Sequence, residues 1–504
     1  MKIFKQVQSF RSRVMANNEF WAILIISIIA LGLRLYRLGA SDFWYDEVYS
    51  IIISQNFLFN WNPPFYFSIL HFWIKLFGVS EFVLRFPSLV FSVLSVPCLF
   101  FLGREVFNYR VGLFACLVMC LSGFHLWYAQ EARPYSLAVL LSILSTYFLY
   151  RFLTERKNKL GFFYFVFSIL GLYSDITYYH LFLIFAQLLG AAVYLRKRTS
   201  LKLFLLVLFI FLIFLLRIEQ FISKFLYVKG GFWIPAPSFK SLITTIENFN
   251  LGYNASVYLY QLSDWLVLIM LAGGVLVVRR KRQWLKSFIF VAILSFLPLI
   301  LAFVFSRKVF PIYLDRSLII FSPYYYLLLG VGVDYLGRHL LKKIVLTVFL
   351  IILLISLSGY YRNLMPAAPE HHLGVVLKKP FKPALRFIEH NFQSGDIIMH
   401  TNSLSQVTFK FYANNKEIKQ DFLFAPGMID SNWNRPYESS AGMVSIEGLA
   451  SIDAKRIWVV SGDWQRSSGL DKNSEAVNSE MSKLSKLDLS LEFDGLLVYR
   501  YLKL

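Results

Sequence analysis

Residues 20–50 read FWAILIISIIALGLRLYRLGASDFWYDEVYS, a strongly apolar run followed by a short acidic segment. The run around Trp21–Leu33 carries no charge and, with its flanks, is long enough to cross a bilayer as a helix. No small-residue cleavage site follows this run, whereas Arg34 and Arg37 do. This predicts an uncleaved first span. The segment after it, DFWYDEVYS, places three acids among aromatic residues at the expected membrane edge.

The composition extends this membrane interpretation to most of the chain. Its 504 residues are 57% hydrophobic, 18% aromatic and 16% charged, with a mean hydropathy of +0.56. Soluble domains carry about 25% charged residues. The net charge of +21 lies almost entirely in the first 361 residues, between apolar runs, because the remainder has 17 Lys and Arg against 16 Asp and Glu. This distribution follows the positive-inside bias and argues against a nucleic-acid partner.

The apolar runs predict a polytopic α-helical membrane protein with about 11 transmembrane helices. The expected spans are 20–36, 83–102, 111–127, 136–150, 161–175, 179–195, 203–217, 263–278, 287–305, 317–334 and 343–360. The stretch 64–77 is apolar but interrupted by His71 and Lys75, and we expect a short helix lying at the interface.

Four clusters of basic residues predict the orientation, since all of them fall on the side of the N-terminus. They begin at Arg151, Arg196, Arg279 and Arg338. We therefore expect the protein in the inner (plasma) membrane, with its N-terminus in the cytoplasm. An odd number of spans places the C-terminus outside, together with the loops 35–82 and 218–262.

Beyond residue 361 the periodicity changes and predicts a small extracytoplasmic α/β domain over 362–504. A helix is expected over 383–392, strands over 396–401 and 456–462, and a terminal strand or hairpin over 490–502. The domain organisation is thus 1–361 in the membrane and 362–504 outside it. We expect the outer domain to lie over the membrane part and to help select the acceptor.

Three outer-face segments carry charge beside aromatic residues. Asp46 and Glu47 lie in the first, Glu131 and Arg133 in YAQEARPYS (128–136), and Arg316 in YLDRS (313–317). Acids can act as bases or metal ligands, and arginines bind phosphate bidentately. Solvated acids in an interfacial turn and a weak surface ion pair remain alternative interpretations. Together, the segments favour group transfer from a membrane-bound phospho-carrier.

Several of these motifs resemble polyprenyl-phosphate-dependent glycosyltransferases of the GT-C superfamily. They are WYDE (44–47), NPPFY (62–66), SEFVLRFPS (80–88) and YAQEARPYS (128–136). The resemblance is to protein O-mannosyltransferases, lipid A aminoarabinose transferases and rhizobial lipopolysaccharide-core transferases. It implies an inverting transfer of a sugar from a polyprenyl-phosphate donor to a lipid, glycan or protein acceptor.

The resemblance also implies roles for individual residues. Asp46 matches the first-loop aspartate that acts as general base, with Glu47 orienting it, and Glu131 matches the second acidic position. Arg133 and Arg316 would hold the donor phosphate. Relatives carry His or Lys at the position of Asn62, so Lys75 or Arg85 would supply the missing charge. No cofactor is indicated, and a divalent cation is left open because His71, His125 and His180 lack close ligand spacing.

Two other classes of function compete with the transferase. A transporter or flippase of lipid-linked sugars would use the same lipids, but such proteins show repeats and mid-membrane polar residues, and neither is present in this sequence. A non-catalytic scaffold leaves the convergence of Asp46, Glu131 and Arg316 unexplained. Within DFWYDEVYS, Asp42 is expected to be a solvated turn residue, and Phe43, Trp44 and Tyr45 to form an interfacial aromatic belt.

Overall fold

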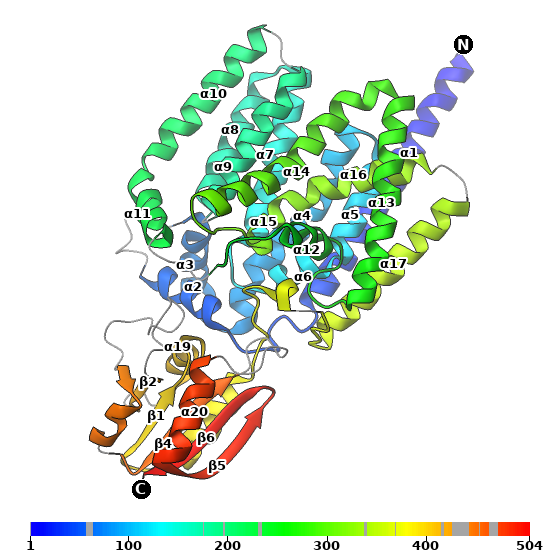
Figure 1. Ribbon diagram of the computed structural model, residues 1–504. Coiled ribbons are helices and arrows are strands. Elements are labelled where there is room, and N and C mark those ends of the chain that lie inside the picture. Colours follow the sequence, from blue (N-terminus) through cyan, green and yellow to red (C-terminus); the bar gives the residue numbers. More distant parts are fainter. Residues whose placement is uncertain are drawn as a thin grey trace.

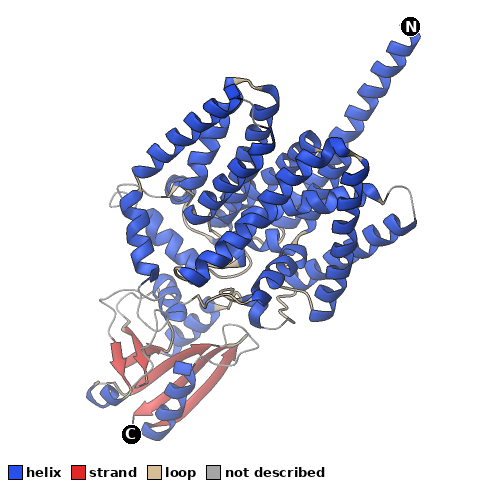
Figure 2. Ribbon diagram, turned by 45° about the horizontal axis from the view of Figure 1, so that its top comes forward, coloured by secondary structure: helices blue, strands red, loops and turns tan. Residues whose placement is uncertain are grey.

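Figure 1 shows the computed structural model, in which a bundle of helices stands on a sheet that carries the C-terminus. The structure describes residues 2–56, 64–174, 176–194, 197–229, 234–336, 340–367, 369–414, 418–425, 443–452, 454–462 and 472–503. The N-terminus lies at the far end of the bundle from the sheet, as Figure 2 also shows.

Eight helical segments within the described residues are long and apolar enough to cross a membrane. They are the Asn18–Leu35 part of α1 (Lys2–Leu35), α4 (Glu81–Val106), α7 (Tyr135–Glu155), α9 with its extension (Thr177–Tyr194), α13 (Val257–Arg280), α14 with its lead-in (Arg282–Lys308), α15 to α16 (Asp315–Tyr335) and α17 (Leu340–Tyr361). A ninth arises if α5 (Tyr109–Leu121) and α6 (Gly123–Ala129), which are bent by 59°, form one broken span. The protein is therefore a multi-pass helical membrane protein.

The expected number of eleven spans is only partly reproduced. Each predicted run falls on one helix or on consecutive helical segments, but α8 (Asn158–Leu172) and the apolar part (Ser200–Leu215) of α10 (Lys197–Leu215) are shorter than a full crossing. Hydropathy measures how apolar a run is and not where its helix ends. The loops 35–82 and 218–262 also contain helices of their own, namely α2 (Tyr45–Gln55), α3 (Phe65–Phe77), α11 (Ile218–Lys229) and α12 (Phe239–Leu251).

The break between α5 and α6 is stabilised by a buried arginine. The Arg34 guanidinium donates to the carbonyls of Met119 and Cys120, both at 3.1 Å, and to the Ser92 hydroxyl at 2.8 Å. Carbonyls at a helix end lack intrahelical partners and carry partial negative charge, so a cation there satisfies both needs. Arg34 thus joins α1, α4 and α5 immediately before the acidic segment.

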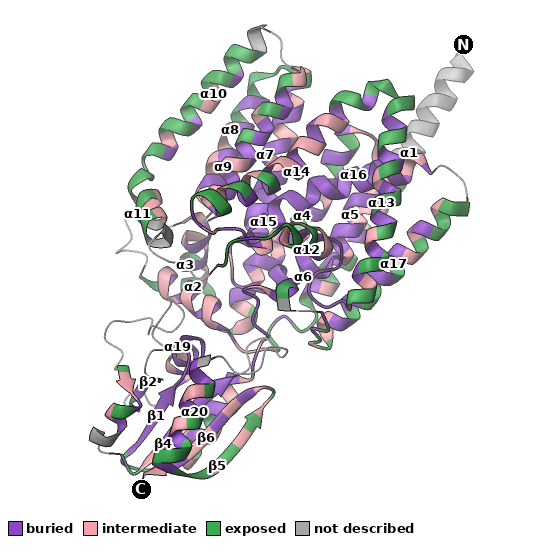
Figure 3. Ribbon diagram, in the orientation of Figure 1, coloured by how far each residue is buried: buried purple, intermediate pink, exposed green. Residues whose placement is uncertain are grey.

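The bundle core is built from tightly packed helices, and Figure 3 shows burial concentrated on its central members. In the contact between α13 and α16, a Cβ added at Gly332 would lie 1.7 Å from the carbonyl oxygen of Met270. Small residues let membrane helices approach closely where lipid provides no hydrophobic drive for association. At the N-terminal end of the bundle, ion pairs of Arg110 and Lys281 with Asp334 tie α5, α13 and α16 together.

The C-terminal region contains one six-stranded sheet in the order β3-β2-β1-β4-β6-β5. Its strands are β1 (Asp396–His400), β2 (Gln420–Phe424), β3 (Met443–Ser445), β4 (Arg456–Gly462), β5 (Ser485–Phe493) and β6 (Leu496–Lys503). Strands β1 to β4 are parallel to one another, and β6 runs antiparallel to β4 and β5. Helices α18 (Phe381–Asn391), α19 (Ser403–Tyr412) and α20 (Lys472–Leu484) complete an α/β region, as the periodicity predicts.

Candidate functional site

Helix α2 begins inside the acidic segment and sets the directions of its two adjacent acids. Glu47 is the third residue of α2, and its carboxylate accepts the backbone N–H of Trp44, the residue before the helix, at 3.4 Å. This bond satisfies a donor that the start of a helix leaves unpaired. Adjacent helical positions face different directions. Asp46 and Glu47 therefore lie in different surroundings.

The Asp46 carboxylate faces two arginines from distant parts of the chain. Its Oδ2 lies 3.4 Å from Nη1 of Arg316 and 3.9 Å from Nε of Arg133. Arg133 donates to the Ser50 hydroxyl at 3.2 Å, and Arg316 to the carbonyl of Gly374 at 2.8 Å, which holds both guanidinium groups beside α2. The three charged side chains are still 12–17% exposed, so a ligand can reach them.

Glu47 is completely buried in an ion pair with Arg85. The two guanidinium nitrogens Nε and Nη2 of Arg85 donate to its carboxylate oxygens at 2.7 and 2.8 Å, and the backbone N–H of Ala132 adds a third bond at 3.0 Å. Burial alone would raise the pKa of Glu47, but Arg85 outweighs it and the pKa lies below its usual value. The remaining donors of Arg85 bind the carbonyls of Leu38, Ser41 and Asp42 at 2.9–3.1 Å.

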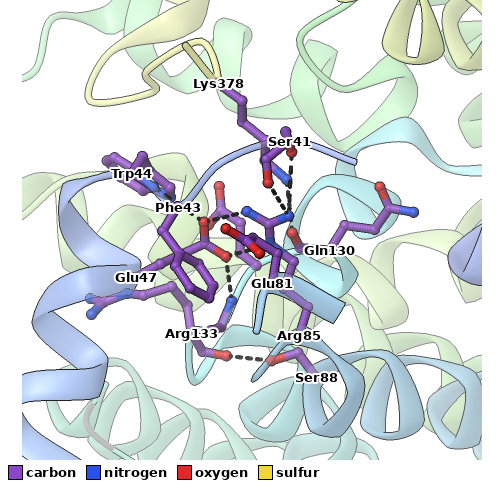
Figure 4. Close-up of polar contacts among 12 residues, drawn as sticks. Ser41, Phe43, Trp44, Glu47, Glu81, Arg85, Ser88, Gln130, Arg133 and Lys378 are labelled. Carbon is purple, nitrogen blue, oxygen red and sulfur yellow. Dashed lines mark hydrogen bonds and ion pairs between the residues drawn. The ribbon is translucent and has the colours of Figure 1, made fainter. Parts of the chain in front are cut away.

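This arrangement, drawn in Figure 4, ties four segments together: the loop after α1, the first turn of α2, α4 and the bend before α7. All five guanidinium N–H groups of Arg85 have acceptors within the protein, so none remains for a donor phosphate. The geometry thus differs from the predicted phosphate contact of Arg85. The sequence shows an arginine near the outer face but not its partner.

Glu131 lies almost completely buried in the bend between α6 and α7. Its Oε1 accepts the indole N–H of Trp127 at 2.7 Å, while its Oε2 has no hydrogen-bond partner among the described residues. Burial raises the pKa of Glu131 to about 7, although the nearby Lys378 acts in the opposite direction. A buried acid with one unsatisfied oxygen and a raised pKa is typical of functional sites.

Lys378 is the residue near these acids that the sequence prediction missed. It lies between the membrane part and the sheet, and its Nζ donates to the carbonyl of Gln130 at 2.8 Å. Burial and the neighbouring Arg85 lower its pKa to about 8. Figure 4 shows Lys378 extending toward the Glu47–Arg85 pair. The local sequence VVLKKP has no pattern that distinguishes this lysine from a solvated one.

The raised pKa of Glu131 predicts a pH-dependent stability. The folded protein keeps the proton up to about pH 7, whereas an unfolded chain releases it near pH 4.5. The contribution of Glu131 to stability is therefore complete below pH 4.5 and is lost as the pH rises to about 7. Because Gln does not titrate, the melting temperature of Glu131→Gln minus that of wild type should be more positive at pH 8 than at pH 5. Scanning fluorimetry of the detergent-solubilised protein measures it, and an equal difference at both pH values would contradict the assignment.

Asp42 and its aromatic neighbours lie against the C-terminal domain and not in the predicted solvated turn and interfacial belt. Asp42 accepts the backbone N–H of Lys382 at 2.8 Å, and burial raises its pKa. The N–H of Phe43 donates to the hydroxyl of Tyr412 at 2.7 Å, and their rings stack. Phe43 and Trp44 are 1% and 5% exposed, so the belt prediction is wrong for both. Amphipathic rings suit a protein contact as well as a lipid interface.

A second set of polar contacts reinforces this junction. Tyr412 donates to Glu81 Oε1 at 2.7 Å, and the Lys382 ammonium also binds Glu81. The ammonium lies 4.8 Å from the centroid of the Tyr412 ring. We define the junction latch as Asp42, Phe43, Glu81, Lys382 and Tyr412. These five residues hold the segment preceding α2 between α4 and the C-terminal domain.

The other predicted residues do not join the acids. Lys75 is exposed near the end of α3 and makes no ion pair with a described residue, and Asn62 lies outside the described residues. His71, His125 and His180 are buried at separate positions. Within the described ranges no three His, Cys, Asp or Glu residues group closely enough to hold a metal ion. The charged side chains that contact Asp46 are Arg133 and Arg316, and guanidinium groups suit an anionic ligand.

Comparisons with known proteins agree with this fold. Residues 62–218 match the family of dolichyl-phosphate-mannose-protein mannosyltransferases. The chain resembles the crystal structure of ArnT from Cupriavidus metallidurans in the apo state, with a TM-score of 0.57 and 12% identity over 95% of this chain and 97% of that one. ArnT from the same organism bound to undecaprenyl phosphate gives 0.56, 12% and the same coverage. No sequence among the curated proteins matches significantly.

The chain therefore combines a multi-pass helical bundle, an acidic loop beside arginines and a small sheet domain beyond the bundle. The matched segment contains the motifs NPPFY, SEFVLRFPS and YAQEARPYS in full, whereas Asp46 and Arg316 lie outside it. The chain thus shares the fold of ArnT over nearly its whole length and matches the mannosyltransferase family over residues 62–218.

Proposed function

We propose that this protein moves a sugar from a polyprenyl-phosphate donor to a hydroxyl group of an acceptor, with inversion at the anomeric carbon. The observation that carries the proposal is the Asp46 carboxylate lying beside Arg133 and Arg316, all within reach of a ligand. The solved ArnT structure with undecaprenyl phosphate supports the class of donor, because that protein shares the fold.

In the proposed reaction the acceptor oxygen attacks C1 of the sugar while Asp46 takes its proton. The new C1–O bond forms as the bond from C1 to the phosphate oxygen breaks, and polyprenyl phosphate leaves with one more negative charge. Arg133 and Arg316 stabilise that charge, which is larger in the transition state than in the bound donor. The two arginines also hold the phosphate in line with the attacking oxygen.

The buried residues have positioning roles in this proposal. Glu47 and Arg85 fix the first turn of α2 and thereby the place of Asp46, so neither touches the substrate. Glu131, with its unsatisfied oxygen, orients the acceptor from the bend between α6 and α7. Positive charge comes from the arginines, and a divalent cation would require ligands beyond the described residues.

The membrane placement is also part of the proposal. Residues 1–361 form the membrane domain, residues 362–504 the extracytoplasmic domain, and the N-terminus faces the cytoplasm. The positive-inside bias of the basic clusters and the position of the sheet opposite the N-terminus support this orientation in an inner membrane. A protease added outside intact spheroplasts should then cleave an epitope tag at the C-terminus but not one at the N-terminus.

Transport of the lipid-linked sugar is not favoured by the shared glycosyltransferase fold and family match. The two activities differ in their products, and the decisive experiment measures both. Deletion of the gene should cause one polyprenyl-linked sugar to accumulate, which mass spectrometry of the lipid extract identifies. Purified protein incubated with that lipid and the envelope fraction of the deletion strain should release free polyprenyl phosphate. Movement of intact lipid across vesicles without its consumption would reject the transferase.

Arg316 provides a test of the phosphate site. Replacing it with Ala should lower kcat/KM for the lipid donor by about 100-fold, the usual cost of losing one preorganised contact to a developing charge. Arg316→Lys should recover only part of this loss, because an ammonium cannot form the bidentate fork. Initial rates of polyprenyl-phosphate release measure both variants. Arg500→Ala, which removes an arginine paired with Asp488 in the sheet, is the control and should retain the wild-type rate. Equal rates for Arg316→Ala and wild type would contradict the assignment.

A further inference from the structure

A cavity of about 720 Å³ opens where the membrane helices meet the C-terminal domain. Its walls come from three parts of the chain: the loop after α1, the ends of α6 and α17, and the segment 378–383 with the turn at Asp494. None of the roles assigned above uses this space. Its size suits two or three sugar rings, since small-molecule sites have volumes of a few hundred Å³.

The charges around the cavity favour an anionic ligand. Four basic residues line it, Arg37, Arg362, Lys378 and Lys379, against two acidic ones. One of these acids, Asp42, already binds Lys382. Arg37 and Arg362 are exposed at the cavity, and Arg362 makes no ion pair with a described residue. An arginine that the protein itself does not neutralise can bind a carboxylate or phosphate bidentately.

The aromatic residues of the cavity favour a sugar over a simple ion. Trp127 and Tyr360 meet edge to face with ring centroids 5.6 Å apart, and Tyr361 packs beside Tyr360 at 5.2 Å. The Tyr360 hydroxyl donates to Gln130 Oε1 at 2.7 Å, which holds these rings in place. Rigid rings with polar edges contact the apolar faces of a sugar while hydrogen-bonding groups beside them meet its hydroxyls.

The cavity adjoins the proposed catalytic residues. Asp42 and Gln130 line it, and each is followed closely in the chain by an acid of the site, Asp46 in one case and Glu131 in the other. Lys378 lies in the cavity wall and donates to the carbonyl of Gln130, while Trp127 donates to Glu131. A ligand in the cavity would therefore lie against the same short segments that position Asp46 and Glu131.

We propose that this cavity binds the acceptor through a carboxylate or phosphate group carried on a sugar, held by Arg37 and Arg362 at the mouth and by Lys378 and Lys379 deeper inside. The identification of this ligand as the acceptor rests on the proposed function. The chemistry of the ligand rests on the cavity alone. The proposal makes the C-terminal segment 378–383 part of the acceptor site.

Binding can be measured without donor and without turnover. The full-length protein in phosphatidylcholine nanodiscs is titrated with fluorescent trigalacturonic acid, and with neutral galactotriose for comparison. We expect the acidic trimer to bind and the neutral one to bind at least about tenfold more weakly, because each charge-assisted contact contributes more than a neutral one. The double variant Arg37→Ala/Arg362→Ala should weaken the acidic trimer by a similar factor. Lys486→Ala, an exposed lysine on β5 away from the cavity, is the matched control and should bind as wild type.

Three results would overturn the proposal. They are no binding of the acidic trimer, equal binding of the neutral trimer, and equal binding by the double variant and wild type. A fourth is displacement of the trimer when phosphatidylglycerol replaces part of the phosphatidylcholine, since the cavity would then hold an anionic lipid headgroup. Asp46→Asn should bind the trimer as wild type does. A normal rate of transfer in that variant would reject the proposed function while leaving the binding result intact.

Discussion

Replacing Asp46 with Asn should abolish sugar transfer while leaving the protein folded. The substitution keeps the size of the side chain but removes the group that takes the proton of the acceptor, and loss of a general base lowers rates by about 10²–10⁴-fold. The variant should also lose its attraction for Arg133 and Arg316, whose nearest contacts to the carboxylate are 3.9 and 3.4 Å. In the proposed reaction Arg133 and Arg316 hold the donor phosphate and Asp46 only takes the proton of the acceptor. Donor affinity should therefore change far less than kcat. Polyprenyl-phosphate release at saturating donor measures this separation.

A matched substitution separates chemistry from charge. Asp488→Asn changes an acid of the same kind on β5, where it pairs with Arg500 and is 32% exposed. It should transfer sugar at the wild-type rate. Near-normal turnover in Asp46→Asn, with a normal melting temperature, would contradict the assignment of Asp46 as the general base. A variant that melts earlier than wild type would instead show that Asp46 stabilises the fold through its arginines.

Replacing Arg85 with Met should destabilise the protein more than any other single substitution at the site. Glu47 is fully buried, and without Arg85 its charge would keep only the backbone N–H bonds of Ala132 and Trp44. Breaking a buried ion pair by removing one partner costs about 3–5 kcal/mol, because an uncompensated charge remains. The loop after α1 would also lose the contacts of Arg85 with Leu38, Ser41 and Asp42. A large fall in melting temperature should be accompanied by loss of transfer.

The companion variant Glu47→Gln/Arg85→Met removes both charges and tests the cause. If the unpaired carboxylate produces the instability, this double variant should melt at a higher temperature than Arg85→Met alone. Arg500→Met removes an arginine from a partly exposed pair and should cost only about 0–1 kcal/mol. Equal melting temperatures for Arg85→Met and Arg500→Met would show that the buried pair is not a main stabilising contact.

Much of the helical architecture could be predicted because hydropathy is a local property of the chain. Every predicted apolar run falls on one helix or on consecutive helical segments, and β4 has the predicted bounds Arg456–Gly462. The lengths of α8 and α10 could not be predicted in this way, since helix ends depend on caps and neighbours. Strands β2 and β3 could not be predicted because runs of five and three residues are too short to show a period of their own.

The sequence could predict those parts of the candidate site that depend only on which side of the membrane a residue faces. Counting spans places Asp46, Arg133 and Arg316 on one face, and the structure brings their charged atoms within 4 Å. Lys378 and Tyr412 could not be found this way, because they lie in a different domain and reach the site only after the chain has folded back.

By itself, the sequence determined that the chain crosses a membrane many times and that Asp46, Arg133 and Arg316 fall on one face, because charge is costly in lipid and must lie at its edge. Only the tertiary structure decided what each charge does there. Asp46 faces two accessible arginines, whereas the adjacent Glu47 is buried against Arg85, and no local pattern separates the two. The same holds for Phe43 and Trp44, which pack against a domain more than 300 residues away in the chain. Burial and pairing depend on contacts between distant residues, and a pattern within one segment does not contain them.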